Sequence, residues 1–170
     1  MNIRPATVDD AYTLWEAESA TATVPGHLAS RPEEISLPGM ATRVHTVSQT
    51  GCFFVAEHNG PLLGHVLLEP MALIAIQHVY RLTLVVHPGR TGQGVGTALV
   101  QHVQRWAASQ ADLHKIELNV RATNTTAVRL YSRLGFQEEG RLRDRIRLPN
   151  GIFIDDILMA WFPPATSTHA

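Results

Sequence analysis

Residues 85–97 decide the fold, and they read Val-Val-His-Pro-Gly-Arg-Thr-Gly-Gln-Gly-Val-Gly-Thr. The apolar start of this stretch ends a strand predicted from about 78 to 87. After a glycine-rich loop the apolar spacing becomes helical, at residues 95, 99, 103 and 106. Free N–H groups at the start of that helix, together with its dipole, favour a bound phosphate. The stretch therefore predicts either an anion site or a simple glycine turn between a strand and a helix.

Two common nucleotide-binding loops do not fit this stretch. A P-loop needs Gly-Lys-Ser/Thr where Gly94-Val95-Gly96 stands. A dinucleotide fingerprint needs Gly or Ala at its sixth place. The frame from Gly92 puts Thr97 there, and the frame from Gly94 puts Leu99 there. Both classes of site are excluded.

The rest of the chain predicts one mixed α/β domain. Strands are expected at about 2–5, 52–58, 62–69, 78–87, 115–120, 136–148 and 152–162. Helices are expected over about 8–19, from residue 30 to an interruption at Pro38-Gly39, over about 39–49, from residue 95, and over 124–134. This order alternates strands and helices without any internal repeat.

Local signals support these elements. Thr7 and Asp10 have the spacing of a capping pair for the first helix, whose apolar positions are 8, 11, 12 and 15. Asn59-Gly60 predicts a tight hairpin turn. Asn124 is a predicted N-cap, and Gly135 is the expected left-handed end of the last helix.

Composition places the chain in the ordinary globular class. It has 170 residues, 45% of them hydrophobic and 17% charged, with a formal net charge of −1. That balance argues against a dedicated nucleic-acid binder. No apolar run is long enough to cross a membrane, the N-terminus lacks the layout of a signal peptide, and a single cysteine excludes an internal disulfide framework. We expect a soluble, cytoplasmic protein.

A second segment, residues 119–136, reads Asn-Val-Arg-Ala-Thr-Asn-Thr-Thr-Ala-Val-Arg-Leu-Tyr-Ser-Arg-Leu-Gly-Phe. Together the two segments resemble the GNAT superfamily of acetyl-CoA-dependent N-acetyltransferases. The loop pattern of that family, Val-x-Pro-x-x-(Gln/Arg)-x-x-Gly-x-(Gly/Ala), is matched at residues 86, 88, 94 and 96. Its helix pattern, Asn-x-x-Ala-x-x-Leu-Tyr-x-x-x-Gly-Phe, is matched from Asn124 to Phe136.

The resemblance runs from Ile3 to about Trp161 and is strongest over 84–136. It implies a single-domain GNAT-type α/β fold, with a mixed, mainly antiparallel central sheet flanked by helices. The domain would occupy residues 1–162, and residues 163–170 would form a C-terminal tail.

The resemblance also implies how acetyl-CoA, the acetyl donor, would bind. Leu84, Val85 and Val86 would run along the pantetheine arm, and the pyrophosphate would be held by Thr91, Gly92, Gln93, Gly94, Val95, Gly96 and Thr97. Asn124 would serve both as an N-cap and as a coenzyme contact. Thr91 stands where the family has Gln or Arg, and Arg90 falls one place early, so a phosphate contact from Arg90 is left open.

Acetyl transfer needs a deprotonated amine, a donor for the developing oxyanion, and an acid for the thiolate. By resemblance, a backbone N–H near Val85 or Val86 polarises the carbonyl. Tyr131 matches the tyrosine of the family that protonates the thiolate, and it also touches the coenzyme. Its helical spacing alone would equally place Tyr131 in the core.

The general base has no firm assignment. Asn119 occupies the position of a catalytic glutamate in some members of the family, but an amide cannot take up a proton. Glu117, two residues earlier on the same strand face, is one candidate. His78 and Tyr80 are others, acting through water, and the ordinary equilibrium of the amine could also suffice.

Other clusters favour structural roles. The nine histidines show no metal-binding spacing, so we predict no metal, and Cys52 reads as a small core residue. Four arginines alternate over 141–147, which on a regular strand would put them on one face. We interpret that face as solvated, with recognition of an acidic group on the substrate as the alternative.

We predict an N-acetyltransferase acting on the primary amine of a small molecule, an amino acid or a related amine. The stretch 140–160, with Asp155 and Met159, is similar to GNAT members that acetylate such amines. One alternative is a protein N-terminal or ribosomal-protein acetyltransferase, and another is a non-catalytic acetyl-CoA-binding module. By resemblance we also expect a homodimer.

Overall fold

The computed structural model describes residues 1–164, and these build seven strands in one sheet of the order β1-β2-β3-β4-β5-β7-β6. The strands are β1 (Asn2–Pro5), β2 (Cys52–Glu57), β3 (Leu62–Pro70), β4 (Val79–Val86), β5 (Lys115–Arg121), β6 (Gln137–Arg147) and β7 (Phe153–Trp161). β4 and β5 pair in parallel, and every other neighbouring pair is antiparallel. The predicted mixed, mainly antiparallel sheet is confirmed. Of the predicted tail, residues 165–170 lie outside the described residues.

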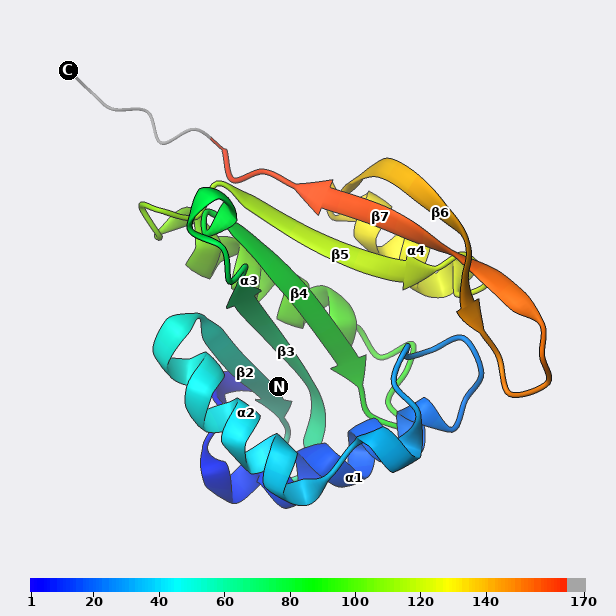
Figure 1. The fold of residues 1–170 in the computed structure, drawn as a ribbon. Helices are drawn as coiled ribbons and strands as arrows, with labels where there is room; N and C mark the ends of the chain where they lie inside the picture. Colours follow the sequence, from blue (N-terminus) through cyan, green and yellow to red (C-terminus); the bar gives the residue numbers. More distant parts are fainter. Residues whose placement is uncertain (165–170) are drawn as a thin grey trace.

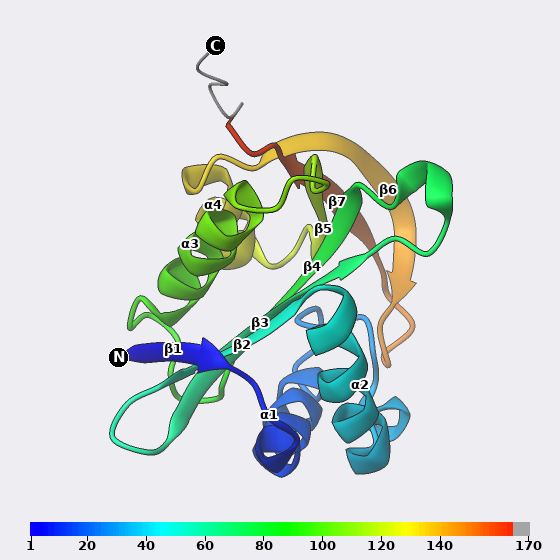
Figure 2. The same ribbon diagram turned by 90° about the vertical axis from the view of Figure 1, so that its left-hand side faces the viewer.

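Helices cover both faces of the sheet (Figures 1 and 2). They are α1 (Ala11–Ala22), α2 (Leu37–Thr50), α3 (Val95–Ala108) and α4 (Thr125–Arg133). Figure 2 shows α1 and α2 on one side of the sheet and α3 and α4 on the other. Two apolar clusters follow from this layering, a larger one under α3 and α4 and a smaller one under α1 and α2.

Turn and cap signals were read correctly from the sequence. Asn59 and Gly60 both have positive φ (51° and 105°), as a tight turn between twisted strands requires. The Asn124 side chain accepts a hydrogen bond from the Ala127 N–H at 3.1 Å and so caps α4. Gly135 takes a φ of 87° just beyond that helix, which is the left-handed end expected there.

The first two helices differ from their predictions. The backbone N–H of Thr7 does donate to Asp10 at 2.8 Å, but residues 8–10 form a single 3₁₀ turn and α1 begins only at Ala11. Its buried residues are therefore Ala11, Leu14, Ala17 and Glu18. Two of the expected core positions, Val8 and Tyr12, are more than half exposed.

The predicted interruption at Pro38-Gly39 is wrong, because α2 runs through both residues. Ser36 caps α2 by accepting the Gly39 N–H at 3.1 Å, and Pro38 lies in the first turn, where its missing N–H costs nothing. The segment predicted as the preceding helix forms only a 3₁₀ turn, Pro32–Glu34. Residues 23–31 form a loop between α1 and this 3₁₀ turn.

Candidate functional site

Strands β4 and β5 separate halfway along their length, and this opening positions the site. Their parallel pairing covers only Val79–Arg81 against Lys115–Glu117. Beyond it, β4 continues to pair with β3 as far as Val86, and β5 continues to pair with β7 as far as Arg121. Figure 1 shows the two strands diverging as a V. The edge of β4 that faces β5 therefore has backbone groups from residue 82 onward with no ladder partner in the sheet.

The glycine-rich loop follows β4 directly and ends at the start of α3. Gly89, Gly92 and Gly94 have φ values of 76°, 76° and 79°, a left-handed conformation that side chains other than glycine's rarely adopt. Gly94 is the N-cap of α3, and the first hydrogen bond of the helix runs from the Ala98 N–H to the Gly94 carbonyl. The N–H groups of residues 95–97 are therefore free of helical partners.

These N–H groups border a hollow between the loop and α4, which we call the loop hollow. Seven of the residues predicted for the coenzyme line it: Val86, Thr91, Gly92, Gly94, Val95, Gly96 and Thr97. Arg90 also lines it, so the arginine that stands one place early in the motif does reach this space.

The remaining predicted coenzyme residues lie elsewhere. Leu84 and Tyr131 line the neighbouring hollow described below. Val85 is buried in the sheet, and Gln93 donates to the Gly89 carbonyl at 3.2 Å within the loop itself. Asn124 lines neither hollow and caps α4.

Four residues of α4 complete the loop hollow, and three of them had no role predicted from the sequence. Thr126, Arg129 and Arg133 line it across from the glycines, while Gly96 leaves room for the helix to approach. A Cβ on Gly96 would stand 3.1 Å from the Leu130 side chain. Positions 126, 129 and 133 have the spacing of one helix face, so the sequence could have indicated that these side chains point the same way. With Arg90, the hollow has three cations and no acidic residue in its lining.

A second hollow lies in the V between β4 and β5, and we call it the central hollow. It is lined by Glu18, the loop residues 28–30, Arg43, residues 81–84 of β4, Asn119, Arg121, Tyr131, Arg145 and Asp156. Leu84 in this hollow and Val86 in the loop hollow are two residues apart on β4. The two hollows therefore open along the same strand.

Tyr131 contributes a buried phenol to the central hollow. It is 7% exposed, and its ring packs edge-on against Phe136 with the ring centroids 5.6 Å apart. Burial raises the pKa of the phenol, and the positive charge of Arg121 pulls it the other way. Tyr131 therefore carries its proton at neutral pH and can donate it. The structure shows that the core role and a place in the hollow are compatible.

The base candidates named from the sequence are not brought together. Glu117 forms an ion pair with Lys115 at 2.8 Å and lies outside the lining of the central hollow. Tyr80 packs toward Trp106 of α3, and His78 packs against His114, so neither borders the hollow. Asn119 does border it. Glu18 of α1 also borders the hollow with its carboxylate. It was not among the base candidates predicted from the sequence.

The four arginines of β6 do not share one face. The pairing of β6 with β7 shifts between Leu142 and Ile146, and Asp144 takes a positive φ of 52° in this irregular stretch. Arg145 lines the central hollow, whereas Arg141 forms an ion pair with Asp155 at 3.4 Å. The bulge thus directs one arginine to the site.

Cys52 is a core residue, as its sequence context indicated. It is 5% exposed, and burial raises the pKa of its thiol to about 12, despite a hydrogen bond with the Leu68 backbone. Within residues 1–164, no three His, Cys, Asp or Glu side chains are grouped so that they could hold a metal ion. In the same part of the chain no helix is long and apolar enough to cross a membrane.

Comparison with known proteins gives a consistent result. The family model described as "Acetyltransferase (GNAT) family" matches residues 12–136. The spermidine N(1)-acetyltransferase of Vibrio cholerae is 32% identical over 61% of this chain and 58% of its own length. The L-amino acid N-acetyltransferase AaaT of Escherichia coli is 27% identical over 62% of this chain and 65% of its own. The match spans about three-fifths of the length of such curated relatives.

Solved structures share the whole fold. A GNAT superfamily phosphinothricin acetyltransferase from Sinorhizobium meliloti, solved in complex with acetyl-CoA, superposes with a TM-score of 0.89. The superposition covers 99% of this chain and 91% of that one, at 17% identity. At that identity the likeness concerns the fold.

Proposed function

This chain belongs to the GNAT acetyltransferase family, and we propose that it transfers the acetyl group of acetyl-CoA to the primary amine of a small molecule, an amino acid or a close relative. The observation that carries the proposal is the continuity of the two hollows along β4. One is suited to a polyanionic coenzyme, and the other ends at a protonated phenol.

The loop hollow supports the coenzyme assignment by its charge and its backbone. Free N–H groups at the start of α3 and the side chains of Arg90, Arg129 and Arg133 suit the phosphates of acetyl-CoA. The pantetheine arm would then follow residues 84–86 along the open edge of β4 into the V. This path would deliver the thioester to the central hollow.

The chemistry follows from that placement. A backbone N–H near Val85 or Val86 would polarise the acetyl carbonyl as the amine attacks it. The phenol of Tyr131, whose pKa is raised by burial, would protonate the departing thiolate. The carbon–sulfur bond breaks as the amide bond forms, and the thiol of coenzyme A leaves.

The central hollow supports an acceptor that carries a negative charge beside its amine. Four arginines line it against two carboxylates, Glu18 and Asp156. Within residues 1–164, Arg81 and Arg145 of this lining form no ion pair with a carboxylate, and the guanidinium of Arg81 lies 3.8 Å from the Met71 sulfur. Two free guanidinium groups suit the carboxylate of an amino acid and repel a polyamine such as spermidine.

A free-thiol assay over amino acids, polyamines and short peptides tests this proposal, with acetyl-CoA as the donor. We expect turnover of one or more amino acids and a higher kcat/KM for them than for their decarboxylated amines. Acetyl-CoA alone should raise the melting temperature by mass action. Preferred turnover of peptides would favour the protein N-terminal alternative. A thermal shift without any turnover would favour the non-catalytic module.

We also propose a homodimer through the β6 end of the sheet. β6 is an edge strand, and Leu142, Ile152 and Phe153 around its hairpin are 39%, 57% and 55% exposed. Sedimentation at several concentrations should give a dimer that Phe153→Asp converts to a monomer. A monomeric wild-type protein would refute this.

A further inference from the structure

Three buried polar residues from distant parts of the chain form a line next to the central hollow. Glu18 belongs to α1, His65 to β3, and His87 directly follows β4, and they are 6%, 0% and 5% exposed. His65 Nε2 lies 3.4 Å from Glu18 Oε2, and His65 Nδ1 lies 3.0 Å from His87 Nε2. Burying three such groups costs free energy that apolar side chains would not.

The hydrogen bonds of this line determine where its protons can be. The two ring nitrogens of His65 and His87 can share their 3.0 Å contact only if one donates and the other accepts. Burial lowers the pKa of His87, and a neutral His87 with its proton on Nδ1 accepts a hydrogen bond at Nε2 from His65 Nδ1. A neutral His65 that donates from Nδ1 has a lone pair on Nε2, which faces Glu18 Oε2. The two atoms attract only when a proton lies between them, so the pair has one place that a proton can occupy.

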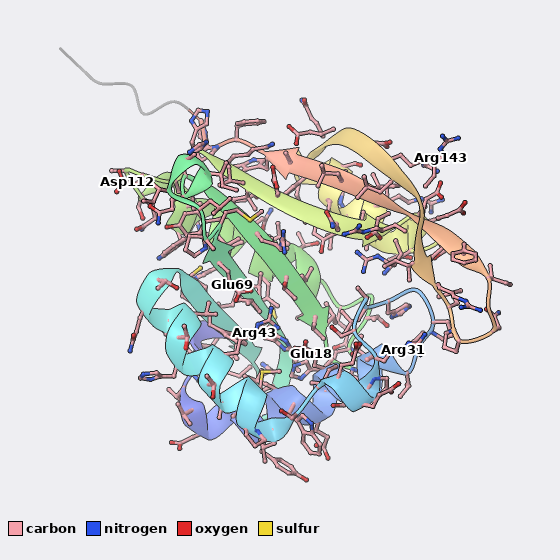
Figure 3. All side chains as sticks on the ribbon, viewed as in Figure 1. Glu18, Arg31, Arg43, Glu69, Asp112 and Arg143 are labelled. Carbon is pink, nitrogen blue, oxygen red and sulfur yellow. The ribbon has the colours of Figure 1, made fainter. Side chains whose placement is uncertain are left out.

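The charges around Glu18 and His65 determine how strongly a proton binds between their two facing atoms. Arg43 of α2 lies 3.5 Å from Glu18 Oε1 and 3.0 Å from Glu69 Oε2 of β3. Figure 3 shows Glu18 and Arg43 close together on the side of the sheet that α1 and α2 cover. Burial would raise the pKa of Glu18, but the charge of Arg43 and, once His65 carries a proton, the hydrogen bond and charge of His65 outweigh burial and lower that pKa. Glu18 is therefore a carboxylate when the hollow is empty.

One end of this line of residues borders the hollow in which the acceptor amine would bind. Glu18 borders the central hollow, and Asn119 and Tyr131 border it from the β5 and α4 side. Other charges that face this space are Arg81 of β4, Arg145 of β6 and the pair formed by Arg121 and Asp156. The carboxylate of Glu18 is therefore placed to meet a cationic amine that lies between the strands.

We propose that Glu18 and His65 together take up the proton that the acceptor ammonium loses before it attacks acetyl-CoA, and that His87 is the positioning residue for His65. This inference rests on the proposed function. The N–H bond of the ammonium breaks, its electron pair stays on nitrogen, and the proton moves to Glu18 and is shared with His65. Tyr131 gives its proton to the thiolate, and the second proton lost by nitrogen restores the phenol. The first returns to solvent, so each turnover releases one proton.

The test is the pH profile of kcat/KM for Glu18→Gln and His65→Gln. The controls are Glu16→Gln, an exposed residue of the same helix, and His45→Gln, an exposed residue of α2. We expect kcat/KM near pH 7 to fall about 10²–10⁴-fold in the two test variants and to recover toward the wild-type rate as rising pH deprotonates the amine unaided. The affinity for acetyl-CoA should be unchanged, and the controls should match the wild type.

A purely structural role would give a different result. If the line only supported the fold, Glu18→Gln would lower the melting temperature while the shape of the pH profile stayed the same, and that result would overturn the proposal. His87→Gln, which can still accept one hydrogen bond, should move the midpoint of the profile with a smaller loss of rate. An unmoved midpoint would remove the positioning role.

A second measurement separates this inference from the proposed function. In the protein without ligands, nitrogen NMR of the histidine rings at a fixed pH should show the His65 Nε2 signal changing in Glu18→Gln but not in Glu16→Gln, and an unchanged signal in Glu18→Gln would refute the shared proton site. Absence of turnover by the wild type with any amine would overturn the proposed function, and the catalytic role of the pair with it. If the wild type turns over an amine and Glu18→Gln keeps the same pH profile of kcat/KM, only the catalytic role of Glu18 and His65 would be refuted.

Discussion

His65 Nδ1 and His87 Nε2 lie 3.0 Å apart across β3 and β4, with both rings buried. Burial lowers the pKa of His87 to about 4, and the positive charge of His65 adds to the effect, against the hydrogen bond to Leu62. His87 is therefore neutral in the folded protein at pH values where an exposed histidine is already protonated.

This difference predicts a loss of stability in mild acid. Between about pH 6.5 and 4 the unfolded chain binds a proton at His87 that the folded protein does not. The free energy of unfolding should therefore fall as the pH drops, by up to roughly 3 kcal/mol from this group. Urea denaturation at pH 7, 6 and 5 measures it. Above pH 5 the carboxylates with lowered pKa, such as Asp10, contribute little.

His87→Gln should flatten this dependence, whereas His27→Gln, at an exposed position, should leave it as it is. Equal slopes for wild type and His87→Gln between pH 7 and 5 would show that His87 titrates normally in the folded state.

Tyr131→Phe should lower kcat and leave acetyl-CoA affinity nearly unchanged. The substitution removes the phenolic proton but keeps the ring against Phe136. General acid catalysis contributes about 10²–10⁴-fold, so we expect a loss in that range. Tyr12→Phe, at a position 56% exposed, makes the same chemical change away from the hollows and should have no effect. Steady-state kinetics with isothermal titration of acetyl-CoA would check both, and a normal kcat in Tyr131→Phe would exclude the acid role.

Gly94→Ala should weaken acetyl-CoA binding about 5- to 30-fold, the factor that corresponds to 1–2 kcal/mol. The residue has a φ of 79° at the N-cap of α3, and an added Cβ would meet no atom within 4 Å. The effect therefore comes from backbone strain, which costs about 1–2 kcal/mol and turns the loop N–H groups away from the hollow. Gly60→Ala is the matched control, since its φ of 105° in the β2–β3 turn carries similar strain without a ligand nearby. Equal Kd values for both variants would contradict this account of the loop.

Much of the fold could be predicted because its signals are local. Alternation marked the strands, glycines with positive φ marked the loop and the end of α4, and the Asn124 cap was correct. The errors also have local causes. The 3₁₀ turn at 8–10 rotated the buried face of α1, so that Glu18 is buried and Tyr12 is exposed. The bulge in β6 broke an alternation that the sequence showed as regular.

The site itself was predicted in part, and distance along the chain explains which part. The loop hollow comes mostly from one continuous segment, and most of its predicted residues line it. The line of Glu18, His65 and His87 joins residues 47 and 22 positions apart. A spacing pattern in the sequence cannot predict these contacts, because they form only when α1 packs across β3 and β4. Among nine scattered histidines, two with a shared role therefore looked like any others.

Arg81→Gln should raise the KM for an amino-acid acceptor about 10–100-fold, because a hydrogen bond to a charged group contributes about 1.5–3 kcal/mol. Arg145→Gln should act in the same direction. Arg143→Gln is the control, since Arg143 lies on β6 like Arg145 (Figure 3) but lines neither hollow and is exposed. The decarboxylated amine should be insensitive to all three changes. Equal effects on acid and amine would show that these arginines do not bind the carboxylate.

Arg121 and Asp156 form an ion pair beneath the central hollow, with side chains 7% and 3% exposed. Arg121 also donates to the Asn119 carbonyl at 2.8 Å, and its pair with Asp156 ties the last residue of β5 to β7, beyond the part of β5 that pairs with β4. Asp156→Asn leaves a buried guanidinium without its countercharge and should lower the free energy of unfolding by about 3–5 kcal/mol.

Asp155→Asn, next in the chain but paired with an Arg141 that is about half exposed, should cost less than about 1 kcal/mol. The double variant Arg121→Met with Asp156→Leu removes both charges and should recover most of the loss. Urea denaturation of the wild type, the two single variants and the double variant measures these differences in the free energy of unfolding. If Asp156→Asn costs no more than Asp155→Asn, solvent reaches the pair, and the wall of the hollow is held by the apolar contacts of β7 alone.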